Sequence, residues 1–199
     1  DRIAFYNEEV RSRELSELAI RDEIRGAIEN DQLVLHYQPI YDLTSGALLG
    51  TEALVRWQHP LRGLLYPGDF IPVAEESGLI VALGSWVIER AMRQAKDWGF
   101  GTARQAKMWI NVSALQLARF QIVDEITDQL SKFAIPSRAI GIEITETALI
   151  DAQPEIDTRL RILRDLGYSI AIDDFGTGYS SLLYLRRYSA DTLKIDRAF

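Results

Sequence analysis

The sequence predicts an α/β fold built as a barrel of parallel strands, and two observations support this. Short apolar segments typical of strands alternate with segments of helical periodicity, which is the pattern of parallel βαβ units. Nearly every predicted strand also has an acid, an amide or a lysine at or near its C-terminal end. A barrel gathers all such ends around one mouth, whereas an open sheet gathers only those at a switch point. We therefore favour the barrel; on six predicted strands alone, a doubly wound sheet remains an open alternative.

The first 57 residues are predicted to hold a short strand and a charged connector over 1–12, then one helix and two further strands. The helix covers 14–30, because isoleucines recur at four-residue spacing and form an apolar stripe: Ile20, Ile24 and Ile28. A strand over 33–40 ends near Pro39, the polar run 43–46 is typical of a turn, and a second strand covers 48–57.

The rest of the chain alternates between helices and strands. Helix 155–166 is closed by Gly167, a plausible residue for the left-handed position after a helix. The strands are short and apolar, as expected of strands covered on both faces. In order, the predicted elements are helix 69–77, helix 85–98, strand 108–114, helix 115–133 (with the stripe Ile122, Ile126 and Leu130), strand 140–146, helix 155–166, strand 169–174, helix 180–187 and strand 192–196.

The composition of the chain excludes several classes of function. The chain has 199 residues, enough for one ordinary domain, and its net charge of −7 opposes binding to a long phosphate backbone. It has no cysteine, which excludes disulfides, thiolate metal sites and a cysteine nucleophile. We interpret its two histidines, His36 and His59, as structural or surface residues. His59 is predicted to lie in a loop with no metal to coordinate. No apolar run is long enough to span a bilayer, so we expect no membrane segment in this chain and a cytoplasmic location.

Charged or amide side chains interrupt the apolar strands at five places. A buried charge is costly unless it is paired or bound to a metal. Singly, such residues are more often salt-bridge partners or satisfied core groups, but their recurrence at strand ends favours a common site. Period-two alternation places Glu52 and Arg56 on one face of their strand. The five segments are 51–57, 109–113, 142–146, 172–178 and 193–196.

The residue types at these positions indicate metal-assisted chemistry. Carboxylate and amide oxygens are hard ligands suited to Mg²⁺ or Mn²⁺. Several carboxylates converging could hold two metals about 4 Å apart, the arrangement that activates water for attack on a phosphodiester. Lys194 could orient that water or stabilise the charge that develops on phosphorus.

A signature triplet and six linked motifs resemble those of the EAL domain family of cyclic di-GMP phosphodiesterases. The signature triplet is Glu52-Ala53-Leu54, and a triplet alone would carry no weight; its companions, in order and over 33–196, make the match specific. The triplet extends to Glu52-Ala53-Leu54-Val55-Arg56-Trp57. Its six companions are Tyr37-Gln38-Pro39-Ile40, Phe70-Ile71-Pro72-Val73-Ala74-Glu75, Asn111-Val112-Ser113, Glu143-Ile144-Thr145-Glu146, Asp173-Asp174-Phe175-Gly176-Thr177-Gly178-Tyr179-Ser180-Ser181-Leu182 and Lys194-Ile195-Asp196.

The resemblance implies a TIM-like (β/α) barrel of the EAL type that cleaves cyclic di-GMP to linear pGpG with two Mg²⁺ or Mn²⁺ ions. It implies that Lys194 lies by the attacking water and that Glu146 holds the loop 173–182, through which such domains are expected to form homodimers. It further implies metal ligands at Glu52, Asn111, Glu143, Asp173 and Asp174, and nucleotide contacts at Gln38, Leu54 and Arg56.

The resemblance also bears on domain limits. The family continues with two further βα units, so we expect residues 13–199 to be an incomplete EAL domain with a weak second metal and impaired activity. Residues 1–12 resemble the last strand of a GGDEF domain and a connector, which implies an upstream GGDEF or sensor domain in a longer protein, one that regions outside this chain could tether to a membrane. The alternative hypothesis is a non-catalytic receptor that binds cyclic di-GMP; metal-dependent turnover separates the two.

Overall fold

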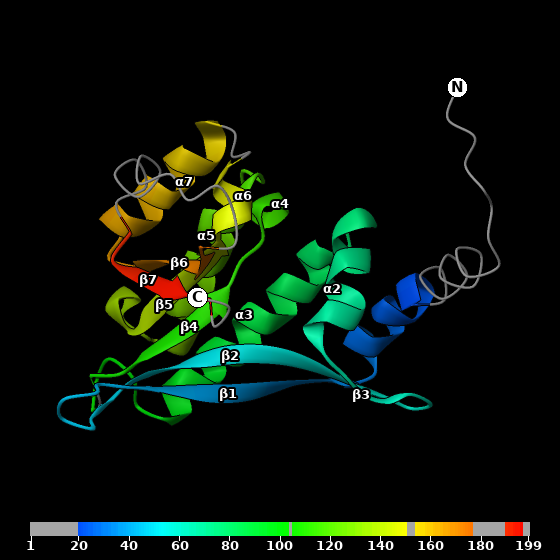
Figure 1. Cartoon of the computed structure of the whole chain (residues 1–199), viewed down its shortest axis with the longest axis horizontal. Helices are drawn as coiled ribbons and strands as arrows, with labels where there is room; N and C mark the ends of the chain where they lie inside the picture. Colours follow the sequence, from blue (N-terminus) through cyan, green and yellow to red (C-terminus); the bar gives the residue numbers. More distant parts are fainter. Residues whose placement is uncertain (1–19, 104, 151–153, 177–189, 197–199) are drawn as a thin grey trace. The chain divides into compact units, whose positions relative to one another are not determined.

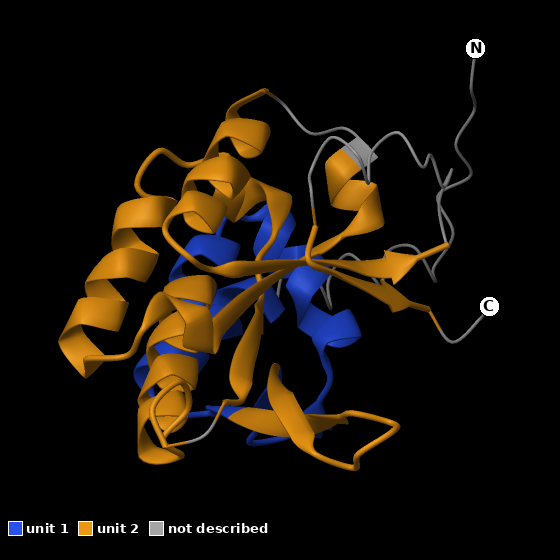
Figure 2. Ribbon diagram, turned by 90° about the vertical axis from the view of Figure 1, so that its left-hand side faces the viewer, with its two compact units in different colours: residues 1–34, 55–83 blue, residues 35–54, 84–199 orange. Residues whose placement is uncertain are grey.

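The structure is a computed structural model that describes residues 20–103, 105–150, 154–176 and 190–196 (Figure 1). The predictions for residues 1–12 and for a helix over 180–187 lie outside these ranges. None of the helices in the described ranges combines the length and apolarity that a membrane span requires. The chain divides into two compact units, which are described separately: residues 1–34 with 55–83, and residues 35–54 with 84–199 (Figure 2).

The strands follow one another around the sheet in chain order, β1-β2-β4-β5-β6-β7. From β2 to β7 these neighbours pair in parallel, as predicted. The order has no reversal and therefore no switch point, which excludes the doubly wound alternative and fits a TIM-like barrel. The strands are β1 (Leu33–Tyr41), β2 (Leu48–His59), β3 (Gly63–Leu65), β4 (Lys107–Asn111), β5 (Ile140–Thr145), β6 (Ser169–Phe175) and β7 (Thr192–Ile195).

The larger unit holds its core around β4, β5 and β6. Five of the six residues of β5 are buried, and β4 buries its three central residues, so these strands are covered on both faces as predicted. β7 differs: Leu193 and Ile195 are exposed, and the prediction of two covered faces is wrong there. The helices of this unit are α3 (Ile80–Asp97, from Gly84 onward), α4 (Ala114–Leu117), α5 (Ile122–Phe133), α6 (Glu146–Ile150) and α7 (Pro154–Asp165).

The predicted helix over 115–133 is wrong, because the chain forms two helices there. Leu117 and Ile122 are both buried, yet they stand five residues apart and could not share one face of a continuous helix. The chain breaks between them, with α4 capped at Ser113, whose hydroxyl accepts from the Gln116 N–H. The predicted strand over 140–146 likewise ends one residue early, because Glu146 begins α6.

The smaller unit contains a helix over 20–29, the end of β2, β3 and α2 (Pro67–Glu76). The buried face of the first helix is Ile20, Ile24 and Ala27, whereas Ile28 is only half-buried; a spacing of seven residues returns to the same face more closely than a spacing of eight. β3 pairs antiparallel with the end of β2 and was not predicted, since a three-residue strand gives no periodicity to detect.

Candidate active site

The parallel register brings the predicted metal ligands to one end of the larger unit. Asn111, the last residue of β4, pairs with Glu143 on β5. Asp173 on β6 pairs with Thr145, two residues beyond Glu143. Glu52 on β2 pairs with Trp109, two residues before Asn111. Four strands therefore supply side chains to one site, as the strand-end pattern predicts.

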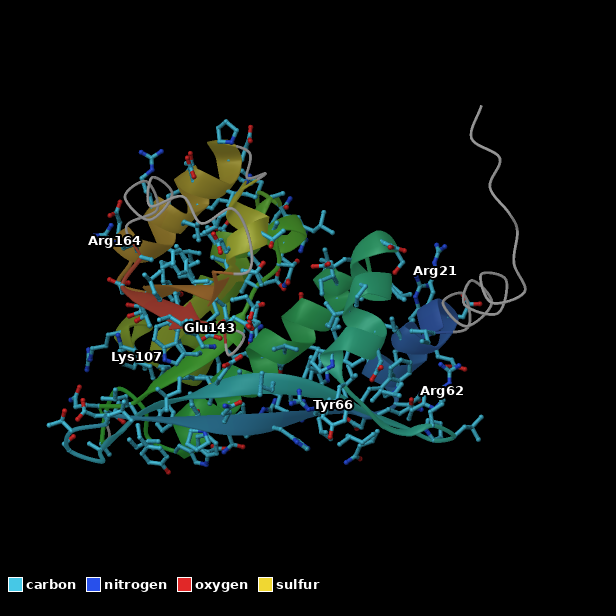
Figure 3. The ribbon with its side chains drawn as sticks, viewed as in Figure 1. Arg21, Arg62, Tyr66, Lys107, Glu143 and Arg164 are labelled. Carbon is cyan, nitrogen blue, oxygen red and sulfur yellow. The ribbon has the colours of Figure 1, made fainter. Side chains whose placement is uncertain are left out.

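Lys194 on β7 joins three of these carboxylates. Its Nζ lies 2.5 Å from Glu52 Oε2, 2.9 Å from Glu143 Oε2 and 3.3 Å from Asp173 Oδ2. Figure 3 labels Glu143 among the strands of this unit. The ammonium group of Lys194 compensates part of the negative charge of the three acids. Without such a cation, burying three carboxylates close together would cost too much free energy.

Glu143 is the most enclosed of the three acids. The residue is 1% exposed, and its Oε1 atom has no hydrogen-bond partner among the described residues. Burial, followed by the negative charge of Glu52, raises the pKa of Glu143 to about 8, against the opposing effect of Lys194. Burying a carboxylate oxygen without a hydrogen-bond partner costs free energy. The single positive charge of Lys194 is therefore too little to balance the three acids.

The same environment acts in the opposite direction on Lys194. Burial alone would lower the pKa of its ammonium group, because the charged form loses hydration. The charge of Glu143 and the hydrogen bonds to Glu52 and Glu143 outweigh burial and raise the pKa of Lys194 above its ordinary value. Lys194 is therefore a permanent cation at neutral pH.

The site fits a hard divalent cation. One oxygen from each of Glu52, Glu143 and Asp173 lies within 4.8 Å of the others. Asn111 donates through Nδ2 to Glu52 Oε1 at 2.8 Å, which leaves its carbonyl oxygen available as a ligand. The free Oε1 of Glu143 and an all-oxygen donor set match the coordination that Mg²⁺ and Mn²⁺ accept.

Asp174 is set apart from this group by the backbone. It has a positive φ of 53°, and the β6–β7 register shifts between Ile172 and Phe175. Its N–H donates to Asp173 Oδ1 at 2.9 Å, and its exposed side chain has a raised pKa, first from burial and then from the neighbouring acids Asp173 and Asp196. Because of this irregularity, the side chains of Asp173 and Asp174 need not point to opposite faces, as adjacent residues of a regular strand do.

Glu146 fixes the backbone beyond Asp174. It is 4% exposed, and its Oε2 accepts from the Gly176 N–H at 2.9 Å. The predicted contact between Glu146 and the loop 173–182 is therefore present at Gly176; residues 177–182 lie outside the described ranges.

The three predicted nucleotide-binding residues do not all belong to the same unit. Gln38 is exposed on β1, and Leu54 is half-buried on the same side of β2 as Glu52. Arg56 belongs to the smaller unit, where its Nη1 donates to the Val55 carbonyl at 2.8 Å and its guanidinium carbon lies 5.0 Å from the centre of the Tyr66 ring. Sequence analysis missed Tyr66, because only the unpredicted β2–β3 hairpin brings it near Arg56.

His59 is not in a loop, so that prediction is wrong. It ends β2, is buried, and its Nε2 lies 2.7 Å from Glu23 Oε2. Its Nδ1 accepts from the Leu61 and Arg62 N–H groups, so the ring fixes the β2–β3 turn. Both ring nitrogens are thus engaged, Nδ1 by the turn and Nε2 by Glu23, consistent with a structural role.

Comparisons with known proteins agree with this geometry. The model of the EAL domain matches residues 21–199. The chain is 43% identical over 196 residues to the bifunctional diguanylate cyclase/cyclic di-GMP phosphodiesterase MucR of Pseudomonas aeruginosa, covering 98% of this chain and 28% of that protein. It is 42% identical over 195 residues to the cyclic di-GMP phosphodiesterase NbdA of the same organism, covering 98% of this chain and 25% of that protein. The chain thus spans about a quarter of the length of these two curated relatives.

Solved structures show the same fold. The MucR phosphodiesterase in complex with cyclic di-GMP superposes with a TM-score of 0.85 at 43% identity, covering 90% of this chain and 73% of that one. An EAL enzyme bound to cyclic AMP and cyclic di-GMP gives a TM-score of 0.83 at 34% identity, covering 92% of this chain and 51% of that one. With a family model matched over most of its length, and with these relatives, the chain belongs to the EAL domain family.

Proposed function

We propose that this domain hydrolyses one phosphodiester bond of cyclic di-GMP to give linear pGpG. The observation that carries the proposal is the group formed by Glu52, midway along β2, with Glu143, Asp173 and Lys194, which lie toward the carboxyl ends of β5, β6 and β7, and with Asn111 beside it. MucR and NbdA, to which the chain is more than 40% identical, are cyclic di-GMP phosphodiesterases by name.

The reaction is a displacement at phosphorus. A bond forms between a water oxygen and phosphorus while the bond from phosphorus to a ribose 3′ oxygen breaks. The attacking water releases one proton to solvent and the departing 3′ oxygen takes up one from solvent, so that it leaves as a hydroxyl and the protons balance. When bound, two divalent cations, Mg²⁺ or Mn²⁺, would supply Lewis-acid activation and offset the negative charge that develops.

Some of the site residues would hold the cations, and others would orient the attacking water and the backbone. Glu52, Asn111, Glu143 and Asp173 would hold the first cation, and Asp173 and Asp174 the second. Lys194 would hold the attacking water in line and offset charge at phosphorus, which its fixed positive charge suits. Glu146 acts one step removed, as a positioning residue that keeps Gly176 and the end of β6 in place.

The nucleotide itself would contact Gln38, Leu54 and Arg56. The stacking of Arg56 on Tyr66 pre-orders the guanidinium group, which reduces the side-chain entropy lost when it binds a phosphate. Its Nε–H is buried without a hydrogen-bond partner among the described residues, so this group remains available to donate a hydrogen bond.

Beyond the catalytic site, three further proposals concern the protein as a whole. They are a homodimer through the loop 173–182, an upstream GGDEF or sensor domain, and a cytoplasmic location. The name of MucR, a bifunctional diguanylate cyclase/cyclic di-GMP phosphodiesterase, supports the second.

The test is metal-dependent turnover by the purified chain. We expect pGpG from cyclic di-GMP with Mn²⁺, none with EDTA, and none from Glu52→Gln. Glu155→Gln removes an exposed acid on α7 and is the matched control, expected to keep full activity. A folded chain that binds cyclic di-GMP with saturating Mn²⁺ and forms no pGpG, even at a chain concentration that would reveal the slow turnover of an impaired site, would contradict the proposal and support the receptor alternative.

A further inference from the structure

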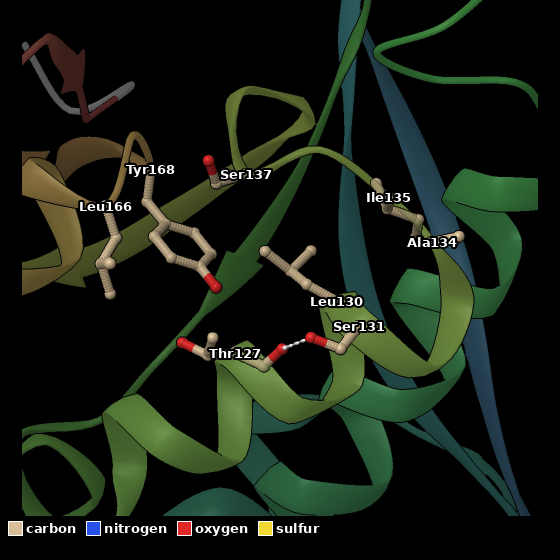
Figure 4. Close-up of a pocket in the computed structure, with 8 residues that line it drawn as sticks. All are labelled: Thr127, Leu130, Ser131, Ala134, Ile135, Ser137, Leu166 and Tyr168. Carbon is tan, nitrogen blue, oxygen red and sulfur yellow. Dashed lines mark hydrogen bonds between the residues drawn. The ribbon is translucent and has the colours of Figure 1, made fainter.

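A pocket lies at the opposite end of the strands from the carboxylates, within the larger unit. It encloses about 300 Å³ between the C-terminal half of α5 and the segments that lead into β5 and β6 (Figure 4). That is at the lower limit of the range of about 300–1,000 Å³ that small-molecule sites occupy. Its lining residues are Thr127, Leu130, Ser131, Ala134, Ile135, Ser137, Leu166 and Tyr168.

Tyr168 gives the pocket an unsatisfied polar group. The residue is 3% exposed, and its hydroxyl makes no hydrogen bond of ordinary length and angle among the described residues, although the Thr127 hydroxyl lies close to it. In Figure 4 the ring extends from the start of β6 toward α5, with its hydroxyl directed toward Thr127 and Leu130. Burial raises the pKa of Tyr168 more than the nearby Thr127 hydroxyl lowers it, so its phenol keeps the proton and is a donor at neutral pH.

Two of the other three hydroxyls of the pocket, those of Thr127 and Ser131, present acceptors. Thr127 Oγ1 donates its proton to the Val123 carbonyl at 2.8 Å, and Ser131 Oγ donates to the Thr127 carbonyl at 3.1 Å. Both protons are thus used within α5, and the oxygen lone pairs remain. The pocket therefore combines a donor and two acceptors with the apolar side chains of Leu130, Ile135 and Leu166.

The lining excludes charged ligands. None of the eight lining residues carries a charge, and a charged group placed there would lose hydration without a compensating partner. An unsatisfied buried hydroxyl favours a ligand that accepts its proton, because satisfying it recovers part of the desolvation cost of the phenol. Cyclic di-GMP, with two phosphate charges, does not fit these conditions.

We propose that this pocket binds an uncharged small molecule with an apolar body and one hydroxyl or amide group, which accepts a hydrogen bond from Tyr168 and donates to Thr127 or Ser131. The site is separate from the carboxylate group and does not depend on the proposed hydrolysis. Tyr168 precedes β6, whose far end carries Asp173, and Ser137 precedes β5, which carries Glu143.

The test uses benzyl alcohol as the probe and toluene as its counterpart without the hydroxyl group. We titrate the ¹⁵N-labelled chain with each and follow the amide signals of residues 127–137 and 166–168. The expected result is saturable shifts of these signals by benzyl alcohol at millimolar concentration, with toluene binding at least fivefold more weakly.

Variants assign the binding to the hydroxyl of Tyr168. Tyr168→Phe removes only that oxygen and is expected to reduce the preference for benzyl alcohol over toluene to less than twofold. Tyr41→Phe, at an exposed tyrosine on β1, is the matched control and should keep the preference. Because the Tyr168 hydroxyl is unsatisfied, Tyr168→Phe should fold at least as stably as the unchanged chain. Ser131→Ala provides a second variant, expected to weaken benzyl alcohol binding.

The proposal is overturned if the signals of 127–137 and 166–168 do not shift saturably, or if both probes bind equally. It is also overturned if Tyr168→Phe keeps the preference, because the hydroxyl would then take no part. A Tyr168→Phe chain that is clearly less stable would contradict the claim that the hydroxyl is unsatisfied.

Discussion

The protonation of Glu143 should set how the stability of the domain changes with pH when divalent metal is removed. The pKa of this carboxyl group is about 8 in the folded chain against 4.5 ordinarily, so the folded state keeps a proton that the unfolded state releases. The stability that this proton contributes is complete below about pH 4.5 and is lost as the pH rises through about 8.

In EDTA we therefore expect the thermal midpoint to fall between pH 5 and pH 8. Glu143→Gln cannot titrate and should flatten that part of the curve. The measurement is circular dichroism melting at five pH values for both chains. Parallel curves for the two chains would contradict the assignment.

Lys194 should contribute to stability as well as to chemistry. Lys194→Met removes one cation from three acids, and breaking a buried pair costs about 3–5 kcal/mol; because the lysine side chain is 24% exposed, we expect about 2–3 kcal/mol. Saturating Mn²⁺ should reduce the loss, because the metal replaces the missing positive charge.

Urea unfolding with and without Mn²⁺ measures both effects. Lys132→Met is the matched control: Lys132 pairs with Glu89 at the surface at 3.0 Å, and its loss should cost no more than about 1 kcal/mol. If the two variants lose equal stability in EDTA, Lys194 does not compensate the acids as described.

At the scale of elements, Gly141 sets the approach of β5 to β4. A Cβ atom built there would lie 2.1 Å from the Trp109 ring, which covers the strand at this point. We expect Gly141→Ala to cost about 1–3 kcal/mol or more through overpacking and to weaken Mn²⁺ binding, since Glu143 stands two residues further along.

Gly68→Ala is the control for that substitution. Gly68 lies in the first turn of α2, and nothing stands within 4 Å of an added Cβ, so we expect no loss of stability. Urea unfolding and Mn²⁺ titration of both variants check this; a Gly141→Ala chain as stable as Gly68→Ala would show that the strand can shift without cost.

These elements also show how far the sequence alone could predict the structure. The strand pattern predicted which polar side chains lie together, because Glu52, Asn111, Glu143, Asp173 and Lys194 interrupt apolar runs at positions that parallel strands bring together; their roles stay a prediction. The division of the 115–133 helix was recoverable in principle, from the five-residue step between Leu117 and Ile122.

Other features cannot be predicted from the neighbouring residues in the sequence. The left-handed backbone of Asp174 depends on the β6–β7 register, and its sequence neighbours do not indicate it. The pairing of Arg56 with Tyr66 depends on a hairpin three residues deep. The burial of His59 depends on Glu23, 36 residues away, so a histidine before Pro60 gave the appearance of a loop residue.

At the scale of the whole molecule, charge should govern the association of cyclic di-GMP. The chain carries a net charge of −7 and the nucleotide two negative charges, so the two repel each other when metal is removed. Screening by salt weakens that repulsion, and we expect the association rate in EDTA to rise between 20 and 200 mM NaCl.

Stopped-flow tryptophan fluorescence measures this rate. With saturating Mn²⁺ the local charge of the site becomes positive, and the rise should shrink or reverse. A rate in EDTA that falls with salt would mean that the field near the site is attractive, set locally by basic groups such as Arg56 rather than by net charge.

The contact between Lys194 and Glu52 spans 142 positions of the chain. During translation, therefore, Glu52, Glu143 and Asp173 all leave the ribosome before their common counter-ion does. At 5–20 residues per second, Glu52 waits on the order of 10 s for Lys194. Over that interval the nascent acids repel one another, and the catalytic centre can form only after β7 has been made. The proposed hydrolysis of cyclic di-GMP should thus begin only after Lys194 has emerged from the ribosome.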